Sequence, residues 1–148
     1  MMPLPVAFRI VVLIAVTLTG GGFGTLAGMV YSEEQYWWVG TITGGGSGIF
    51  LAWVYLRVLA RFSSDYTKGS RWLVGTGTAV GCGIVCTLLV HGVMILLTYD
   101  GQPPANDLGN SIYGIAVTIG LIMGAGAGLI VGGICSLIYI YLPKASKP

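Results

Sequence analysis

The sequence predicts an all-α integral membrane protein with four transmembrane helices. The chain has 148 residues, of which 55% are hydrophobic and only 8% are charged, whereas a soluble domain carries about 25% charged residues. The hydrophobic residues are concentrated in long runs, and a helix needs about 20 of them to cross a bilayer. Together these observations exclude an ordinary soluble domain.

Four apolar runs bounded by charge, aromatic residues or proline predict spans at positions 6–31, 36–59, 72–99 and 112–142. The connections between them are short, which predicts two antiparallel hairpins in a single domain covering positions 1–148. No basic segment precedes the first run, which is longer than the core of a signal peptide. We therefore expect the first helix to remain in the mature protein.

The charged residues predict the orientation of the four helices. Only one acid, Asp65, lies on the side that carries all seven basic residues: Arg9, Arg57, Arg61, Lys68, Arg71, Lys144 and Lys147. The opposite side carries Glu33, Glu34, Asp100 and Asp107 and no basic residue. The positive-inside rule then predicts that both termini are cytoplasmic, and the bacterial inner membrane is the simplest location. We expect Arg57, Arg61, Lys68 and Arg71 to meet lipid headgroups.

Aromatic residues near both ends of the predicted helices support these boundaries, because tyrosine and tryptophan prefer the membrane interface. The aromatic residues expected at the inner surface are Phe8, Trp53, Tyr55, Phe62, Trp72, Tyr139 and Tyr141. Those expected at the outer surface are Tyr31, Tyr36, Trp37, Trp38, Tyr99 and Tyr113.

Glycine recurs at steps of four in every predicted helix. These glycines are Gly20, Gly24 and Gly28 in the first helix, Gly40, Gly44 and Gly48 in the second, Gly77 and Gly81 in the third, and Gly120, Gly124, Gly128 and Gly132 in the fourth. Four residues rotate a helix by only about 40°, so each set forms one strip. Small residues let membrane helices approach closely. The pattern predicts glycine-zipper packing, closest in the outer half between helices 1 and 2 and in the inner half between helices 3 and 4.

Additional glycines lie on other helix faces: Gly21, Gly22, Gly45, Gly46, Gly83, Gly126 and Gly133. A four-helix monomer needs fewer close faces than these glycines supply. We interpret the surplus as surface for other chains, pigments or lipids.

His91 is the only histidine and the main candidate for chemistry inside the membrane. A neutral imidazole could ligate haem iron or chlorophyll magnesium, and Gly92 beside it would leave room for a ring. The alternative, which we favour, is a hydrogen bond within the bundle. Haem with two histidine ligands would need the second one from another chain.

Metal, catalytic and nucleic-acid sites are not predicted. Cys82 and Cys86 share a face of the third helix, but His91 lies about 140° away from Cys86, so the three cannot close on one metal. No nucleophilic triad can be assembled around the single histidine. The glycine runs have no Lys-Ser/Thr after them and are not phosphate loops. No basic aromatic patch indicates nucleic-acid binding. The protein is therefore not expected to be an enzyme.

The length, the four spans and the glycine strips resemble the duplicated proteolipid of rotary ATPase rings. That resemblance covers the general architecture. The central carboxylate that ion transport requires is missing from helices 2 and 4, whose polar residues are Thr41, Thr43, Ser47, Thr118 and Ser136. An ion-carrying ring subunit is therefore not predicted, and small multidrug exporters fail in the first helix for the same reason.

Two acids could mark the entrance of an oligomeric pore. Glu33 and Glu34 would form an acidic outer ring in such an oligomer, but the segment Ser32-Glu33-Glu34-Gln35 reads more simply as a capping box that starts the second helix. We therefore treat this pair first as a helix cap.

The sequence thus predicts a non-catalytic membrane subunit that packs through glycine-rich faces into a larger membrane protein complex. Its expected partners are membrane lipids and other subunits or copies of itself, with bound lipids and no cofactor. Two alternatives stay open. The first is a small homo-oligomeric channel lined by Thr, Ser and Gly, and the second is a haem- or pigment-binding subunit that uses His91.

Overall fold

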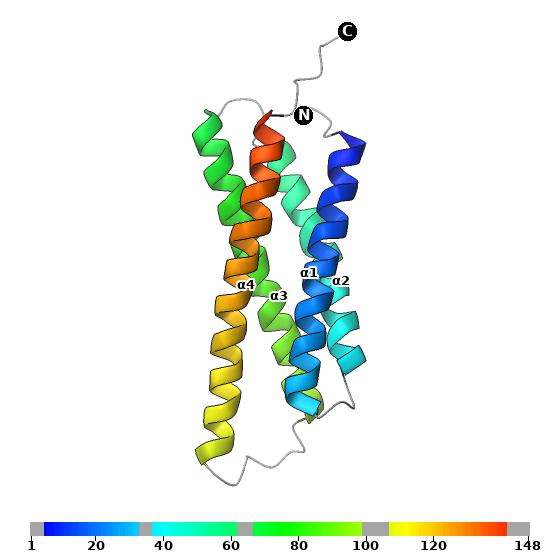
Figure 1. Ribbon diagram of the computed structural model, residues 1–148, viewed down its shortest axis with the longest axis vertical. Coiled ribbons are helices and arrows are strands. Elements are labelled where there is room, and N and C mark those ends of the chain that lie inside the picture. Colours follow the sequence, from blue (N-terminus) through cyan, green and yellow to red (C-terminus); the bar gives the residue numbers. More distant parts are fainter. Residues whose placement is uncertain (1–4, 33–36, 62–66, 99–106, 142–148) are drawn as a thin grey trace.

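The computed structural model describes residues 5–32, 37–61, 67–98 and 107–141, and within these ranges it consists of four α-helices (Figure 1). They are α1 (Val6–Ser32), α2 (Trp37–Arg61), α3 (Lys68–Thr98) and α4 (Asp107–Tyr141). No strand occurs in these ranges. The predicted all-helical class is confirmed.

All four helices are long and apolar enough to cross a membrane, over Val6–Val30, Trp37–Arg61, Lys68–Leu97 and Gly114–Tyr141. This is consistent with an integral membrane protein. The glycine-rich stretches remain helical although glycine disfavours helices in water. In an apolar surrounding every backbone polar group must be satisfied within the segment, and a helix does so.

Two helices begin before their predicted starts. Helix α3 begins at Lys68 rather than at position 72, and α4 begins at Asp107 rather than at position 112. At α3 the cause is an N-cap, because the Thr67 hydroxyl accepts a hydrogen bond from the Ser70 amide (3.3 Å). The prediction followed apolar residues and missed this polar first turn.

Successive helices run in opposite directions, so the start of α1, the end of α2, the start of α3 and the end of α4 gather at one end of the bundle (Figure 1). We name this the basic end, because the described basic residues lie there: Arg9, Arg57, Arg61, Lys68 and Arg71. The other end is the far end. Helix α1 packs along α2, and α3 packs along α4.

Contacts between the two helix pairs are uneven. Helix α2 meets α3, and α1 meets α3, whereas α1 and α4 make the fewest close backbone approaches of any contacting pair. Near the far end, Ala27 of α1 packs with Val90 and Met94 of α3 in a buried cluster. In Figure 1 the far end of α4 stands away from α1. Helix α1 therefore packs closely against α3 near the far end, whereas its packing against α4 is sparse.

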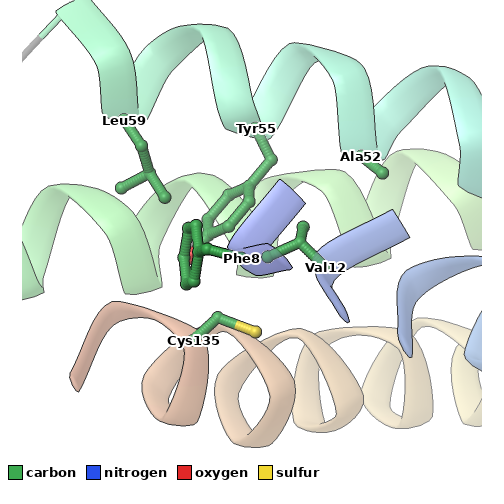
Figure 2. Close-up of a cluster of buried hydrophobic side chains, with 6 residues drawn as sticks. All are labelled: Phe8, Val12, Ala52, Tyr55, Leu59 and Cys135. Carbon is green, nitrogen blue, oxygen red and sulfur yellow. The ribbon is translucent and has the colours of Figure 1, made fainter. Parts of the chain in front are cut away.

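The largest buried cluster lies toward the basic end. Its six members are Phe8, Val12, Ala52, Tyr55, Leu59 and Cys135 (Figure 2). The sequence placed Phe8 and Tyr55 at the membrane interface. Both residues lie toward the basic end, but their side chains are buried among the helices, since Phe8 is 5% exposed and Tyr55 is 3% exposed. Both rings fill the space between helices instead.

Candidate functional site

A cavity of about 350 Å³ runs through the bundle and is lined by all four helices. Its lining residues lie between positions 16 and 30 on α1, 48 and 55 on α2, 79 and 91 on α3, and 115 and 135 on α4. On α4 these positions span about 30 Å at 1.5 Å per residue, so the cavity is elongated along the helix axes. It is the principal candidate for a functional site.

The hydroxyl groups that line the cavity are bonded to backbone carbonyls. Thr19 donates to the Ala15 carbonyl (2.7 Å), and Thr87 donates to the Gly83 carbonyl (3.0 Å). Such bonds to the residue four positions earlier are typical of Ser and Thr in helices. The cavity therefore presents mainly carbon atoms to anything inside it.

His91 lies in the cavity wall and is 8% exposed. Its Nδ1–H donates to the carbonyl of Thr87 (2.8 Å), so in the neutral ring Nε2 carries the lone pair. The imidazole packs against α4 at Gly120, where an added β-carbon would lie 2.7 Å from Nε2. Glycine at position 120 is thus required for the observed place of the ring.

The three cysteines are free, and each has different neighbours. Cys86 shares a hydrogen bond with the Ser47 hydroxyl (3.1 Å), Cys82 points at the Leu51 carbonyl (3.8 Å), and Cys135 belongs to the buried cluster. Within the four described ranges no group of three His, Cys, Asp or Glu residues could hold a metal ion. In this structure the cysteines act as small packing residues that join α3 to α2 and α4 to the core.

Glycines of α1 and α2 meet backbone to backbone. A β-carbon on Gly24 would overlap the carbonyl group of Gly40 and would lie 3.2 Å from the Cα of Gly44. Gly20 and Gly44 stand in the same relation, and a β-carbon on Gly28 would lie 2.6 Å from the Cα of Trp37. These contacts occupy the half of each helix next to the far end.

Glycines of α4 meet α3 in a similar way, but at other positions than the sequence indicated. The residues of α4 are the predicted Gly120, Gly124, Gly128 and Gly132. The residues of α3 that they meet are Ala79, Gly83, Thr87 and His91, which also follow one another at steps of four. This contact, with Gly75 against Ser136, extends from the basic end past the middle of α3 and is not confined to the inner half.

Gly77 and Gly81 do not contact α4, which corrects their expected role in hairpin packing. Both are exposed, and a β-carbon on either would meet no atom within 4 Å. They lie two residues away from Ala79 and Gly83, and two residues turn a helix by about 200°. They therefore occupy the outward face of α3.

A pair of hydroxyl groups closes the basic end of the cavity. The Tyr55 hydroxyl donates to the Gly132 carbonyl (3.4 Å) and shares a hydrogen bond with the Ser136 hydroxyl (3.0 Å). The Tyr55 ring lies between Leu59 and Val12 in the buried cluster (Figure 2). The sequence analysis placed Tyr55 at the inner surface and missed its burial, although Gly48, Tyr55 and Leu59 continue the buried strip of α2.

Replacing Tyr55 by Phe should lower the free energy of unfolding by about 1 kcal/mol, the usual net value of one buried hydrogen bond. The Ser136 hydroxyl, which is 0% exposed, would lose its tyrosine partner. SDS-induced unfolding in mixed micelles measures the effect. The matched control is Tyr141→Phe, because Tyr141 is 77% exposed. Equal stability of the two variants would contradict the role assigned to the Tyr55 hydroxyl.

The candidate headgroup residues lie at the basic end and two of them stack on aromatic rings. The guanidinium of Arg57 lies 4.5 Å from the centre of the Trp53 ring, and the Lys68 ammonium lies 5.8 Å from the centre of the Tyr141 ring. Arg61 is exposed and Arg71 is half-buried. Glu33 and Glu34, the predicted acidic pair, lie outside the described residues.

The described helices thus form an elongated apolar cavity with a histidine in its wall. Some of their glycines pack between helices, and others, such as Gly77 and Gly81, face outward. Comparison of the chain with protein-family models, with curated proteins and with solved structures finds no match in any of the three. The functional proposal therefore rests on the geometry of the chain itself.

Proposed function

We propose that this protein is a non-catalytic integral membrane subunit that joins other membrane chains through glycine-rich helix faces. The observation that carries the proposal is the outward face of α3. Exposed residues follow one another along this face, namely Leu73, Gly77, Gly81, Val85, Leu88, Gly92 and Leu96. Three of them are glycines around which there is open space.

Glycine on a lipid-facing surface has no evident advantage. It disfavours the helix by about 1 kcal/mol relative to alanine in water, and it offers lipid no side chain to contact. On a face that meets another helix it allows close approach and van der Waals packing. Gly77 and Gly81 are one turn apart and both exposed, as a helix-packing pair would be. They support a partner helix docked on α3, from another subunit or from a second copy.

The test is replacement of Gly81 by Leu in protein extracted from its native membrane in mild detergent. We expect the variant to fold and to run as a smaller species in native mass spectrometry, because leucine holds the partner helix away. Gly77→Leu should behave in the same way. The control is Ile14→Trp, which adds bulk to the exposed face of α1. A wild-type protein that is monomeric in lipid discs would overturn the proposal, as would full assembly of both glycine variants.

The purified protein can also be tested for the two alternative functions, pigment or haem binding and channel activity. A pigment- or haem-binding subunit is favoured by the position of His91 in the cavity wall, and it requires visible absorbance that disappears in His91→Ala. A channel requires conductance in a reconstituted bilayer. The hydroxyls of Thr118 and Ser47 bond to carbonyls of their own helices, which leaves them poorly placed to line a water-filled pore.

The basic end and the termini belong to the same proposal. Cytoplasmic termini are supported by the gathering of Arg9, Arg57, Arg61 and Lys68 at one end of the bundle, and the bacterial inner membrane is the simplest membrane with that orientation. Stacking of Arg57 on Trp53 at this end suits a site near lipid headgroups. Protease protection of tags placed at either terminus checks the orientation.

A further inference from the structure

We propose that the cavity between α1 and α4 binds one acyl chain of a membrane lipid, inserted from the side. This goes beyond assembly through the α3 face and is independent of it. Four features of the cavity carry the inference: its opening, its lining, its size and its closed end.

The cavity opens sideways, in the half of the bundle next to the far end. Several of its lining residues are themselves exposed: Leu26 (54%) and Val30 (66%) on α1, and Ile115 (57%) and Ile119 (52%) on α4. These residues form two rims that face each other across the gap between α1 and α4, which make the fewest close approaches of any contacting helix pair. All four rim residues lie within segments long and apolar enough to span a membrane. The opening therefore faces lipid hydrocarbon.

The lining selects an apolar occupant. Among the described residues that line the cavity none is Asp, Glu, Lys or Arg. The hydroxyls of Thr19 and Thr87 are bonded to carbonyls of their own helices, and so is Nδ1 of His91. A charged group would lose its water inside the cavity and would find no oppositely charged side chain among these residues. A lipid headgroup must consequently stay outside the rims while its chain enters.

The size of the cavity suits a chain and is too small for a helix. An engineered apolar cavity of about 150 Å³ holds one benzene molecule, so about 350 Å³ has room for roughly fourteen carbon atoms. An α-helix about 10 Å wide that rises 1.5 Å per residue would fill the same volume with about three residues. The elongated lining along α4 likewise fits a chain and not a compact ring.

The end of the cavity that lies toward the basic end is closed by packed side chains. Tyr55 and Cys135 line this end and belong to the cluster that includes Phe8 and Val12 (Figure 2). A chain that enters between Leu26 and Ile119 would therefore run toward the basic end and end near Tyr55, about 20 Å away along α4 at 1.5 Å per residue. This gives each carbon of the chain an expected neighbour, so the proposal predicts where a labelled carbon will react.

The experiment uses the full chain in phosphatidylcholine vesicles that contain a small fraction of a photoreactive phosphatidylcholine. One probe carries a diazirine at the end of an acyl chain, and a second carries it next to the ester. After irradiation, peptide mass spectrometry maps the labelled residues. We expect the first probe to label Tyr55 and Cys135 and the second to label the rims near Leu26 and Ile119.

Variants on α4 provide a matched pair for the same experiment. Ala127 lines the cavity, whereas Ala125, two residues earlier on the same helix, does not. Ala127→Phe should abolish labelling of Tyr55 and Cys135 by the chain-end probe, and Ala125→Phe should retain it. If Ala127→Phe fails to fold, the depth order of the two probes in the wild-type protein still decides the question.

Three results would overturn the proposal. The first is wild-type labelling confined to outward-facing residues such as Ile14 and Leu96. The second is labelling of Tyr55 that is the same for both probes. The third is the finding of a polypeptide, a pigment or a prenyl chain in the cavity, shown by cross-linking at Leu26 or by mass spectrometry of an organic extract. None of these results bears on whether Gly81→Leu disrupts assembly.

Discussion

Replacing Gly24 by Leu should separate α1 from α2 and lower the free energy of unfolding by about 3 kcal/mol or more. Overpacking a protein core usually costs about 1–3 kcal/mol, because neighbouring side chains can shift. At Gly24 even a β-carbon would overlap the carbonyl group of Gly40, and that group is backbone and cannot rotate away. The helices must therefore move apart. SDS-induced unfolding in mixed micelles, followed by circular dichroism, measures the loss.

The matched control for this variant is two residues away on the same helix. A β-carbon on Gly22 would meet no atom within 4 Å, so Gly22→Leu should leave the free energy of unfolding within about 0.5 kcal/mol of the wild type. The two variants have the same composition and hydropathy. Equal stability of the two would show that the contact between Gly24 and Gly40 does not hold the helices together.

The helices themselves could be predicted because their signals are local. Long apolar runs, rare charges and interfacial aromatics are read directly along the chain, and no other structure satisfies the backbone of such runs in lipid. The starts of α3 and α4 were harder to predict. The Thr67 cap precedes a first turn that contains Lys68, Ser70 and Arg71, so apolar periodicity begins only after the helix has begun.

The glycines of α3 show where periodicity fails. Gly75 and Gly83 lie on one side of the helix, and Gly77 and Gly81 lie on the other. Both sets have helical spacing, so spacing alone cannot decide which one faces α4. The residues between the glycines decide which side faces α4. Ala79 and Thr87 lie on the same side as Gly75 and Gly83 and are small enough to let α4 approach, although neither is glycine.

The cavity could not be predicted from the sequence, because it depends on the separation of α1 and α4 along their length. Leu26 and Ile119 look like ordinary lipid-facing residues when read in sequence. Only the arrangement of the helices makes them the rims of an opening. The burial of Tyr55 was missed for a related reason: a tyrosine near a helix end is typical of an interface, but its hydroxyl bonds to Ser136 and Gly132 in the core.

Replacing Gly83 by Leu should push α3 away from α4 and lower the free energy of unfolding by about 3 kcal/mol or more. A β-carbon at this position would overlap the carbonyl oxygen of Gly124 and lie 2.9 Å from its carbon. As at Gly24, the obstacle is backbone, so the cost should exceed the usual range for overpacking by side chains. Such a loss should also disturb His91, which lies farther along the same contact with α4.

Gly81→Leu is the control that separates contacts inside the chain from contacts with partners. Because Gly81 faces open space, this variant should unfold like the wild type, within about 0.5 kcal/mol, and yet lose assembly in native mass spectrometry. Gly83→Leu should lower both the stability of the monomer and the assembly, because the monomer itself no longer folds correctly. If Gly81→Leu destabilises the monomer as much as Gly83→Leu does, α3 presents its other face to α4, and the strip of Gly77 and Gly81 belongs to the interior after all.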